Sequence, residues 1–305
     1  AKCMRMFSFF TNEHTDAIRD EVMERLSRFV EASKGYDITL CHENEKGIYG
    51  VVLHPRIGVP ESIPYLSDSF MHYIKTAVEC AAKLGMVIVL YDEAMYPSGS
   101  AHGLVVKENP KYASQAIILT DDPDEGHLIA DLNNGTYIVQ VPSGGTIRGI
   151  HFGEDDGEKN APPAADLLSQ EAVDTFIRLT HQRYYEVVGD SFGTTVIGFF
   201  TDEPSVLGRC AKRGCQPWTW GFEDDFVRAG GKLEALAGLF TGEDNESTVL
   251  YRKMIFDREL EVYYASLHRF CEEHGIFGLA VAFLVGWAMQ ALVQMPAHLL
   301  MVLFH

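Results

Sequence analysis

Basic residues and cysteines are scarce in this sequence. Its 305 residues include 25 Lys and Arg against 43 Asp and Glu, which gives a formal net charge of −18 at pH 7. A partner with a phosphate backbone needs a basic surface, so this charge argues against nucleic acid. Of the six cysteines, only Cys210 and Cys215 lie close together in the sequence, as a C-x4-C pair. Without a second close pair this spacing does not define a zinc site, and free thiols are the default expectation in a reducing cytoplasm.

The chain also lacks internal repeats, long low-complexity runs and an apolar signal core near its first residue. Residues 1–5 are Ala-Lys-Cys-Met-Arg, so no secretion signal is visible and a cytoplasmic location is expected. A signal that had been removed from a longer precursor would leave the same start. With 47% hydrophobic residues, the chain can bury a large core as one barrel or as two smaller domains.

Three apolar runs are each followed at once by ionisable side chains. Continuous apolar runs are typical of parallel strands that are buried on both faces. The runs cover residues 50–54, 86–92 and 194–200, and the ionisable residues at their ends are His54, Arg56, Asp92, Glu93, Asp202 and Glu203. In parallel α/β barrels the C-terminal ends of the strands share one face, where the chemistry is done. Taken singly, such a pair of acids is typical of a solvated loop that caps the next helix, which is the simpler interpretation.

The segments between these runs predict helices that connect parallel strands. Ser67 or Asp68 can cap a helix that ends at Leu84, and Gly85 suits the position after its last turn. A strand, a helix and a strand with short joints predict a parallel βαβ unit. Further helices are expected at 13–32, 169–188, 223–240 and 248–274, and a further strand at 37–41. Four strands are half of a (β/α)8 TIM barrel, so we expect an incomplete barrel whose open sheet edges allow self-association.

Residues 113–163 interrupt this pattern with short β-prone runs. The runs are residues 116–120, 127–131, 136–141 and 146–152, separated by turn-forming residues. Asn134-Gly135 is a strong hairpin signal. We therefore expect an antiparallel insertion after the third strand, between a first barrel part at 1–112 and its continuation at 164–275. The acidic run at 153–163 can hold calcium, but its spacing differs from an EF-hand loop and a solvated charged loop is the simpler interpretation.

Residues 51–274 carry several motifs, one after another along the chain. They are Gly-Val-Val-Leu-His-Pro-Arg-Ile-Gly at 50–58, Tyr-Leu-Ser-Asp at 65–68, Leu-Tyr-Asp-Glu at 90–93, Tyr-Pro-Ser-Gly at 96–99 and Phe-Thr-Asp-Glu-Pro at 200–204. In this order they resemble the motifs of large bacterial glycoside hydrolases related to the α-L-rhamnosidases. The resemblance implies a TIM barrel that hydrolyses O-glycosidic bonds in an oligosaccharide or glycoside substrate.

Glycoside hydrolysis usually needs two carboxyl groups that flank the bond. We expect Glu203 to act as the general acid or acid/base, and Asp202 to hold sugar hydroxyls beside it. Like charges close together would raise one pKa toward the useful range. Other strand ends and loops are expected to bind the substrate, and one of their acids can supply the second carboxyl group: Asp92, Glu93, His54, Arg56, Tyr96 and Trp218. Two assignments stay open, because Tyr96 can be a rim residue without a ligand and Trp218 can be a core residue.

A second interpretation comes from residues 42–46, which read His-Glu-Asn-Glu-Lys. Residues 13–50 resemble sugar isomerases and epimerases of the xylose-isomerase type, and this resemblance implies a divalent metal such as magnesium or manganese held by carboxylates. The hydrolase interpretation needs no cofactor. Binding of a divalent metal such as calcium or manganese stays an open alternative. A third interpretation is a non-catalytic sugar-binding or membrane-tethered fragment, because half a barrel carries only part of a site.

Residues 276–305 form an apolar tail that contains no Asp, Glu, Lys or Arg. The tail is long enough to span a bilayer. Gln290, Gln294 and Pro296 interrupt it, and no Lys or Arg immediately flanks it, so a membrane span is not favoured. It matches neither of the two families, and we expect it to be foreign to the rest of the fold.

Overall fold

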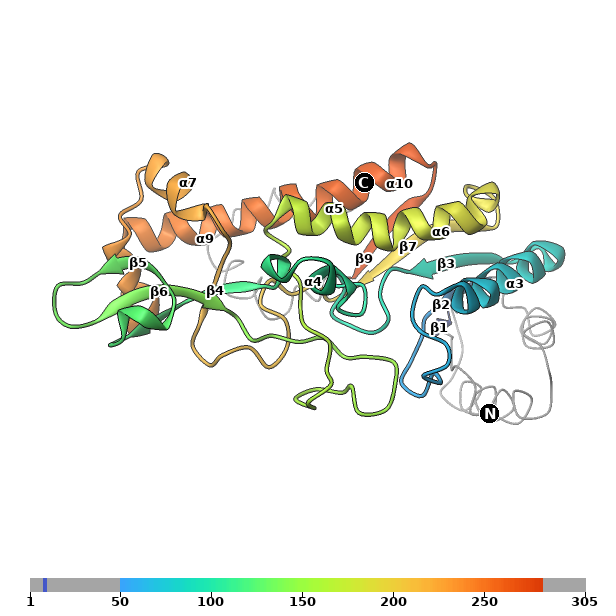
Figure 1. Cartoon of the computed structure of the whole chain (residues 1–305). Coiled ribbons are helices and arrows are strands. Elements are labelled where there is room, and N and C mark those ends of the chain that lie inside the picture. The colour runs from blue at the N-terminus through green and yellow to red at the C-terminus, as the bar shows by residue number, and fades with distance from the viewer. Residues whose placement is uncertain (1–7, 10–49, 282–305) are drawn as a thin grey trace.

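The computed structural model describes residues 8–9 and 50–281. These residues form a mixed α/β structure in which a mainly parallel sheet and an antiparallel sheet lie toward opposite ends of an elongated arrangement (Figure 1). The helix predicted at 13–32, the strand at 37–41, the isomerase-like residues 42–46 and most of the apolar tail lie outside the described residues. Within the described ranges, no helix is both long enough and apolar enough to cross a membrane.

The mainly parallel sheet has the strand order β1-β2-β3-β7-β9. Its members are β1 (Ser8–Phe9), β2 (Gly50–Leu53), β3 (Val87–Tyr91), β7 (Val196–Asp202) and β9 (Phe277–Val281). β1 pairs antiparallel with β2, and the other neighbours are parallel. The three predicted apolar strands are confirmed. β9 corrects one expectation, because the first residues of the tail belong to this sheet and pair with β7.

α3 (Asp68–Leu84) connects β2 to β3, as predicted. The Ser67 side chain accepts a hydrogen bond from the backbone N–H of Phe70 at 3.2 Å, so it caps the first turn. Gly85 ends the helix with a φ of 67°, a left-handed conformation that a residue without a Cβ adopts at little cost. Side chains along one face of α3 join the core that also contains the parallel sheet: Phe70, Ile74, Ala77, Val78 and Ala81.

The antiparallel sheet has the strand order β5-β6-β4-β8. Its members are β4 (Gln115–Thr120), β5 (His127–Asp131), β6 (Tyr137–Pro142) and β8 (Gln216–Trp218). The first three confirm the predicted β-prone runs after β3. The run at 146–152 is wrong as a strand, because Thr146 forms only isolated bridges. β8 is not among the strands predicted from the sequence, because three residues that include a proline are too short to show a strand period. It is defined by its pairing with β4.

The remaining helices are α4 (Leu104–Glu108), α5 (Gln170–Leu179), α6 (His181–Val188), α7 (Phe222–Arg228), α8 (Gly238–Thr241), α9 (Glu246–Glu259) and α10 (Ala265–Glu273). Short 3-10 turns cover Pro110–Tyr112, Pro123–Glu125, Gly189–Ser191 and Glu234–Ala237.

The helix predicted at 169–188 is two helices that meet at Thr180. The helix predicted at 223–240 is interrupted after α7, where Gly230 has a φ of 96°. The helix predicted at 248–274 is confirmed, with a π-helical turn at Leu260–Tyr264 between α9 and α10.

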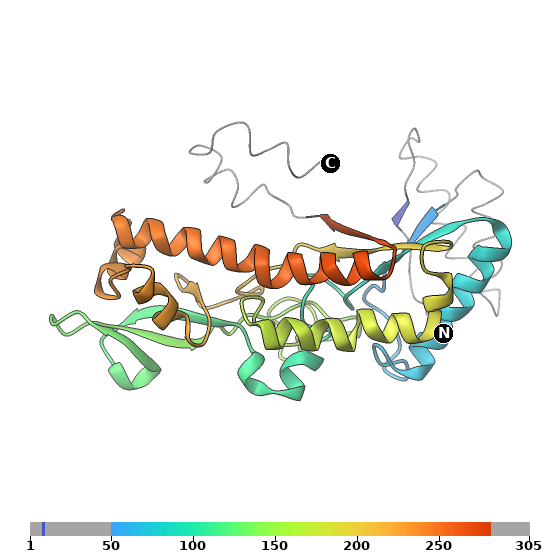
Figure 2. The ribbon, with the colours of Figure 1, turned by 90° about the horizontal axis from the view of Figure 1, so that it is seen from above.

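α9 and α10 form one long helix that spans both sheets, and α5 and α6 run beside it (Figures 1 and 2). Tyr251 and Ile255 of α9 belong to a core cluster with Trp218 of β8. Leu267 and Phe270 of α10 belong to the larger core cluster that contains the parallel sheet. The same helix therefore packs into both cores and fixes the two sheets relative to each other.

The two faces of the parallel sheet have different surroundings. Ile88 and Leu90 of β3 face the helices and belong to the core that they build with the sheet. Tyr91 belongs to a small separate cluster that contains no residue of a described helix. Side chains alternate between the faces along a strand, and β7 follows this alternation after a bulge in its pairing with β3. Thr201 consequently lies on the helix face and Asp202 on the opposite face.

Candidate functional site

The C-terminal edge of the parallel sheet brings several predicted site residues together. On the face away from the helices, the Nε2 atom of His54 lies 3.6 Å from the Oδ2 atom of Asp202. The Tyr91 hydroxyl donates a hydrogen bond to the same oxygen at 3.3 Å. The rings of His54 and Tyr91 are stacked, with their centroids 3.8 Å apart. β2, β3 and β7 thus deliver one side chain each to a single contact around the Asp202 carboxylate.

The imidazole in this group is neutral near pH 7. Burial lowers the pKa of His54, and the positive charge of Arg56 lowers it further, whereas the hydrogen bond to Asp202 acts in the opposite direction. Asp202 keeps 17% of its side chain exposed, so its carboxylate is reachable from solvent. An accessible carboxylate that is positioned by a phenol and a neutral imidazole can accept hydrogen bonds from sugar hydroxyls.

Asp92 lies at the same edge but on the helix face. Its Oδ1 atom accepts a hydrogen bond from the Ser98 hydroxyl at 2.7 Å, and its Oδ2 atom has no hydrogen-bond partner among the described residues. The side chain is fully buried, and this burial raises the pKa of Asp92 well above its usual range. His181, whose Nε2 atom lies 3.8 Å from Oδ2, is also buried, which lowers its pKa to about 3. Burial therefore disfavours the charged form of both groups in this contact.

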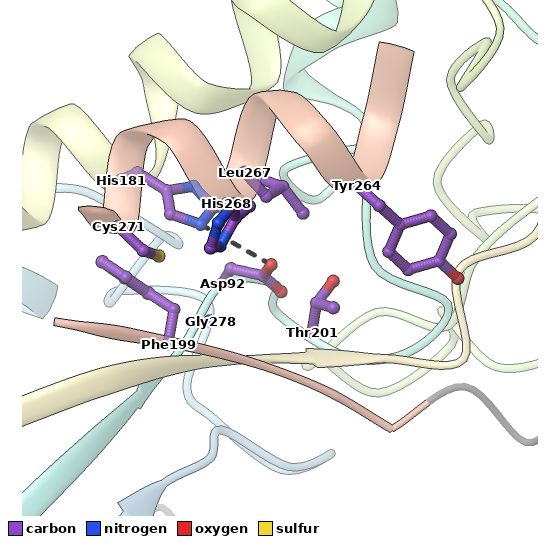
Figure 3. Close-up of a pocket in the computed structure, with 9 residues that line it drawn as sticks. All are labelled: Asp92, His181, Phe199, Thr201, Tyr264, Leu267, His268, Cys271 and Gly278. Carbon is purple, nitrogen blue, oxygen red and sulfur yellow. Dashed lines mark ion pairs between the residues drawn. The ribbon is translucent and has the colours of Figure 1, made fainter. Parts of the chain in front are cut away.

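A small pocket opens beside Asp92. Figure 3 shows Asp92 and Thr201 pointing from the strand ends toward α10, which contributes Leu267, His268 and Cys271 to the opposite wall. The pocket volume is about 180 Å³. Ligand sites usually have volumes of about 300–1,000 Å³, so this pocket is too small for an oligosaccharide. It lies behind the strand ends, on the side of the sheet that the helices cover.

Ser98 connects the acids on the two faces. Its hydroxyl donates to Asp92, as described above, and accepts a hydrogen bond from the backbone N–H of Asp202 at 2.9 Å. Its own backbone N–H donates to the carbonyl oxygen of Asp202 at 2.8 Å. The loop that follows β3 is therefore attached to the last residue of β7, and the positions of the two carboxylates depend on each other.

Glu93 was predicted to bind substrate, but its side chain is bonded to the backbone of its own loop. Its side chain is fully buried. The Oε1 atom accepts hydrogen bonds from the backbone N–H groups of Ala94 and His102, and the Oε2 atom from those of Ser100 and Ala101, at 2.6–2.8 Å. With both oxygens engaged and no exposed surface, Glu93 has no atom free to contact a substrate. Burial raises the pKa of Glu93 to about 7. The four N–H donors favour the carboxylate and act in the opposite direction, because each of them lowers this pKa.

Glu203 combines an unusual backbone conformation with a side chain that has no hydrogen-bond or ion-pair partner among the described residues. Its φ is 43°, which a residue with a side chain adopts only at a cost of about 1–3 kcal/mol. The residue is half-buried, and no side chain or backbone group in the described part of the chain forms a hydrogen bond or ion pair with its carboxylate. Within residues 50–281, the carboxylate is therefore not engaged at this edge of the sheet.

The other three predicted residues are exposed to solvent or covered by protein groups. Arg56 is exposed next to β2. The guanidinium groups of Arg148 and Arg209 lie over the Tyr96 ring, 5.2 and 4.8 Å from its centroid, so protein groups occupy the surface that a sugar would use. Trp218 corrects the prediction, because it is fully buried in the core of the antiparallel sheet.

Sequence reasoning missed His181, Tyr91 and Ser98 as parts of this arrangement. His181 follows Ile177 by four residues and precedes Tyr184 by three, so helical spacing alone places it on the inward stripe. Tyr91 immediately precedes Asp92 in the strand, so alternation places these two side chains on opposite faces. Ser98 belongs to the Tyr-Pro-Ser-Gly motif, but the sequence does not indicate that its hydroxyl contacts two strand ends.

Comparisons with protein-family models, with curated proteins and with solved structures found no match to this chain. The resemblance to glycoside hydrolases consequently rests on the sequence motifs alone, and the functional argument rests on the geometry of the strand ends.

Replacing Glu93 by Gln should destabilise the protein by on the order of 3 kcal/mol, because an amide group can accept at only one of its two ends and leaves buried N–H donors without an acceptor. Chemical denaturation of the wild type and the variant measures the difference in the free energy of unfolding. Glu79→Gln, at an exposed position of α3, is the matched control and should change it little. Equal stability of the wild type and Glu93→Gln would show that the four contacts do not anchor the loop.

The buried acids should make the protein less stable as the pH rises from about 4 to about 7. Burial raises the pKa of both Glu93 and Asp166 to about 7, from 4.5 and 3.8. In this interval the folded protein retains protons that the unfolded chain releases, so the free energy of unfolding falls with pH. Denaturation at several pH values measures the slope.

The Asp166→Asn variant identifies the source of that slope. An amide does not titrate, and the Thr219 hydroxyl, which donates to Asp166, can accept from the new amide instead. The dependence on pH should therefore become weaker in this variant. A slope that Asp166→Asn leaves unchanged would mean that other groups cause the loss of stability.

Proposed function

We propose that this chain is a glycoside hydrolase whose active site lies at the C-terminal edge of β2, β3 and β7. The observation that carries the proposal is the pair Asp202 and Glu203, two incompletely buried carboxylates at the end of a strand in the middle of the sheet. Strained backbone clusters at catalytic and ligand-binding sites, which supports a functional role for the left-handed Glu203. Hydrolysis of a glycosidic bond requires such accessible carboxyl groups.

The wider architecture proposed here is part of a (β/α)8 barrel. Parallel neighbours β2, β3, β7 and β9, with helices over one face, agree with consecutive units of such a barrel. The face away from the helices would then be the barrel interior, with His54, Tyr91 and Asp202 in its uppermost layer. Active sites of barrels lie at this end of the strands, which agrees with the position of Glu203.

The roles of the residues follow from their accessibility. Glu203 would protonate the leaving oxygen, since its carboxyl group is not engaged by other described residues. Asp202, held by Tyr91 and His54, would bind hydroxyl groups of the sugar or serve as the second carboxylate. Asp92, which was a candidate for that role, is fully buried, and it would position Ser98 and thereby Asp202.

Sugar binding without hydrolysis is a second candidate, supported by a separate pocket. This pocket of about 470 Å³ is lined by Trp220 and Tyr112 together with polar side chains that include Lys111 and Arg258. Trp220 is 49% exposed, so part of its indole is open to solvent. The apolar face of a sugar ring packs well against an indole, while its hydroxyls need polar partners.

Replacing Glu203 by Gln should reduce hydrolysis of aryl glycosides by a factor of about 100 or more, since general acid catalysis contributes roughly that much. Release of nitrophenol from a panel of nitrophenyl glycosides, with the α-L-rhamnoside among them, measures the loss. Glu234→Gln, at an exposed position after α7, is the control and should retain full activity. Full activity of Glu203→Gln would refute the assignment.

The same panel separates the two candidate functions. If the wild-type protein binds a sugar in calorimetry but does not release nitrophenol, the binding function holds and the hydrolase proposal fails. In that case Trp220→Ala should abolish binding and Glu203→Gln should not.

A further inference from the structure

Two histidines and a glutamate meet in loops outside the site described above. His102, His151 and Glu154 each offer a ligand atom, and these atoms all lie within 4.8 Å of one another. The closest pair is the Nε2 atom of His102 and the Oε2 atom of Glu154, at 2.9 Å. His102 comes from the loop after β3, and the other two residues come from the loop that follows the antiparallel strands β4–β6.

The His151 ring is oriented in the way that metal-binding histidines usually are. Its Nδ1 atom lies 2.8 Å from the carbonyl oxygen of Val59. A carbonyl oxygen can only accept, so Nδ1 carries the hydrogen and the Nε2 atom of the neutral ring keeps a free lone pair. In metal sites the nitrogen that does not bind the ion commonly donates to a carbonyl or carboxylate in this manner. The ring itself is buried, with 8% of its surface exposed.

His102 is held in place by the backbone instead. Its φ is 57°, and its N–H donates to the buried Glu93 carboxylate at 2.6 Å. The side chains of His102 and Glu154 remain 14% and 18% exposed, which leaves a path for an ion from solvent.

Glu154 is brought to the two rings by a close turn of its own loop. The backbone N–H of Gly149 donates to the carbonyl oxygen of Glu154 at 2.7 Å. A Cβ atom at Gly149 would come within 2.2 Å of the Glu154 Oε2 atom, so only glycine leaves space for the carboxylate there. Arg148 and Arg209 form ion pairs with the neighbouring acids, Asp155 and Asp156, and not with Glu154.

We propose that His102, His151 and Glu154 bind a divalent transition-metal ion of the zinc type. Imidazole nitrogens with one carboxylate suit zinc, whereas calcium and magnesium prefer oxygen ligands throughout. Three protein ligands leave a fourth position for water or for an oxygen atom of a ligand. The ion would link the loop after β3, the loop at 149–154 and, through the Val59 carbonyl, the segment before α3. This proposal does not depend on hydrolysis at Glu203.

Isothermal titration of the chelator-treated 305-residue chain with zinc chloride tests the site. The wild type should bind one zinc ion at this site, and His151→Ala and Glu154→Gln should each weaken that binding roughly tenfold or more. Glu154→Gln preserves the size of the side chain, so it tests ligation even if His151→Ala folds poorly. The control is His72→Ala, an exposed histidine on α3, which should bind as the wild type does.

A second readout reports the coordination directly. Cobalt added in place of zinc should give visible absorption bands of a four-coordinate ion in the wild type and in His72→Ala, and these bands should be lost in Glu154→Gln. The proposal is overturned if the wild type binds no zinc, or if neither His151→Ala nor Glu154→Gln weakens binding. Either result would mean that His102 and Glu154 form a metal-free hydrogen bond.

Discussion

The buried carboxylate of Glu93 is the contact on which the arrangement of the strand ends depends. It gathers four backbone N–H groups from Ala94 and from residues 100–102, and so closes the loop after β3 onto itself. Backbone N–H groups that lose water must find acceptors, and a carboxylate with two oxygens satisfies all four at once. The closed loop then places Ser98 against the end of the neighbouring strand β7. It also places His102 next to His151 and Glu154.

From this loop the two faces of the sheet acquire different chemistry. On the helix face, Asp92 is fully buried beside His181, and burial raises the pKa of Asp92 and lowers the pKa of His181. On the opposite face, Asp202 remains accessible and is held by Tyr91 and His54. The Ser98 hydroxyl donates to the Asp92 carboxyl group and accepts from the backbone N–H of Asp202, so one hydroxyl group connects the two residues.

Much of the fold could be predicted because local patterns and packing agree there. Ser67 and Gly85 mark the two ends of α3, and continuous apolar runs identify β2, β3 and β7. The site was harder, because Asp92-Glu93 and Asp202-Glu203 have the same form in the sequence, an apolar strand followed by two acids. What separates them is burial under the helices and the return of the loop to Glu93, which are both tertiary effects.

The tryptophans and the short strand illustrate the same limit. Trp218 and Trp220 are two residues apart, yet Trp218 is fully buried and Trp220 is 49% exposed. A strand places residues two apart on the same face, so periodicity would have treated them alike. β8 ends at Trp218, and its pairing with β4 determines which indole enters the core.

Amide hydrogen exchange of the wild-type protein, followed by NMR, tests the central role of Glu93 most directly. The account predicts that the amides of Ser100, Ala101 and His102 exchange as slowly as those in the neighbouring strand β3, although none of the three lies in a helix or strand. Exchange of these amides at the rate of an exposed loop would contradict the account.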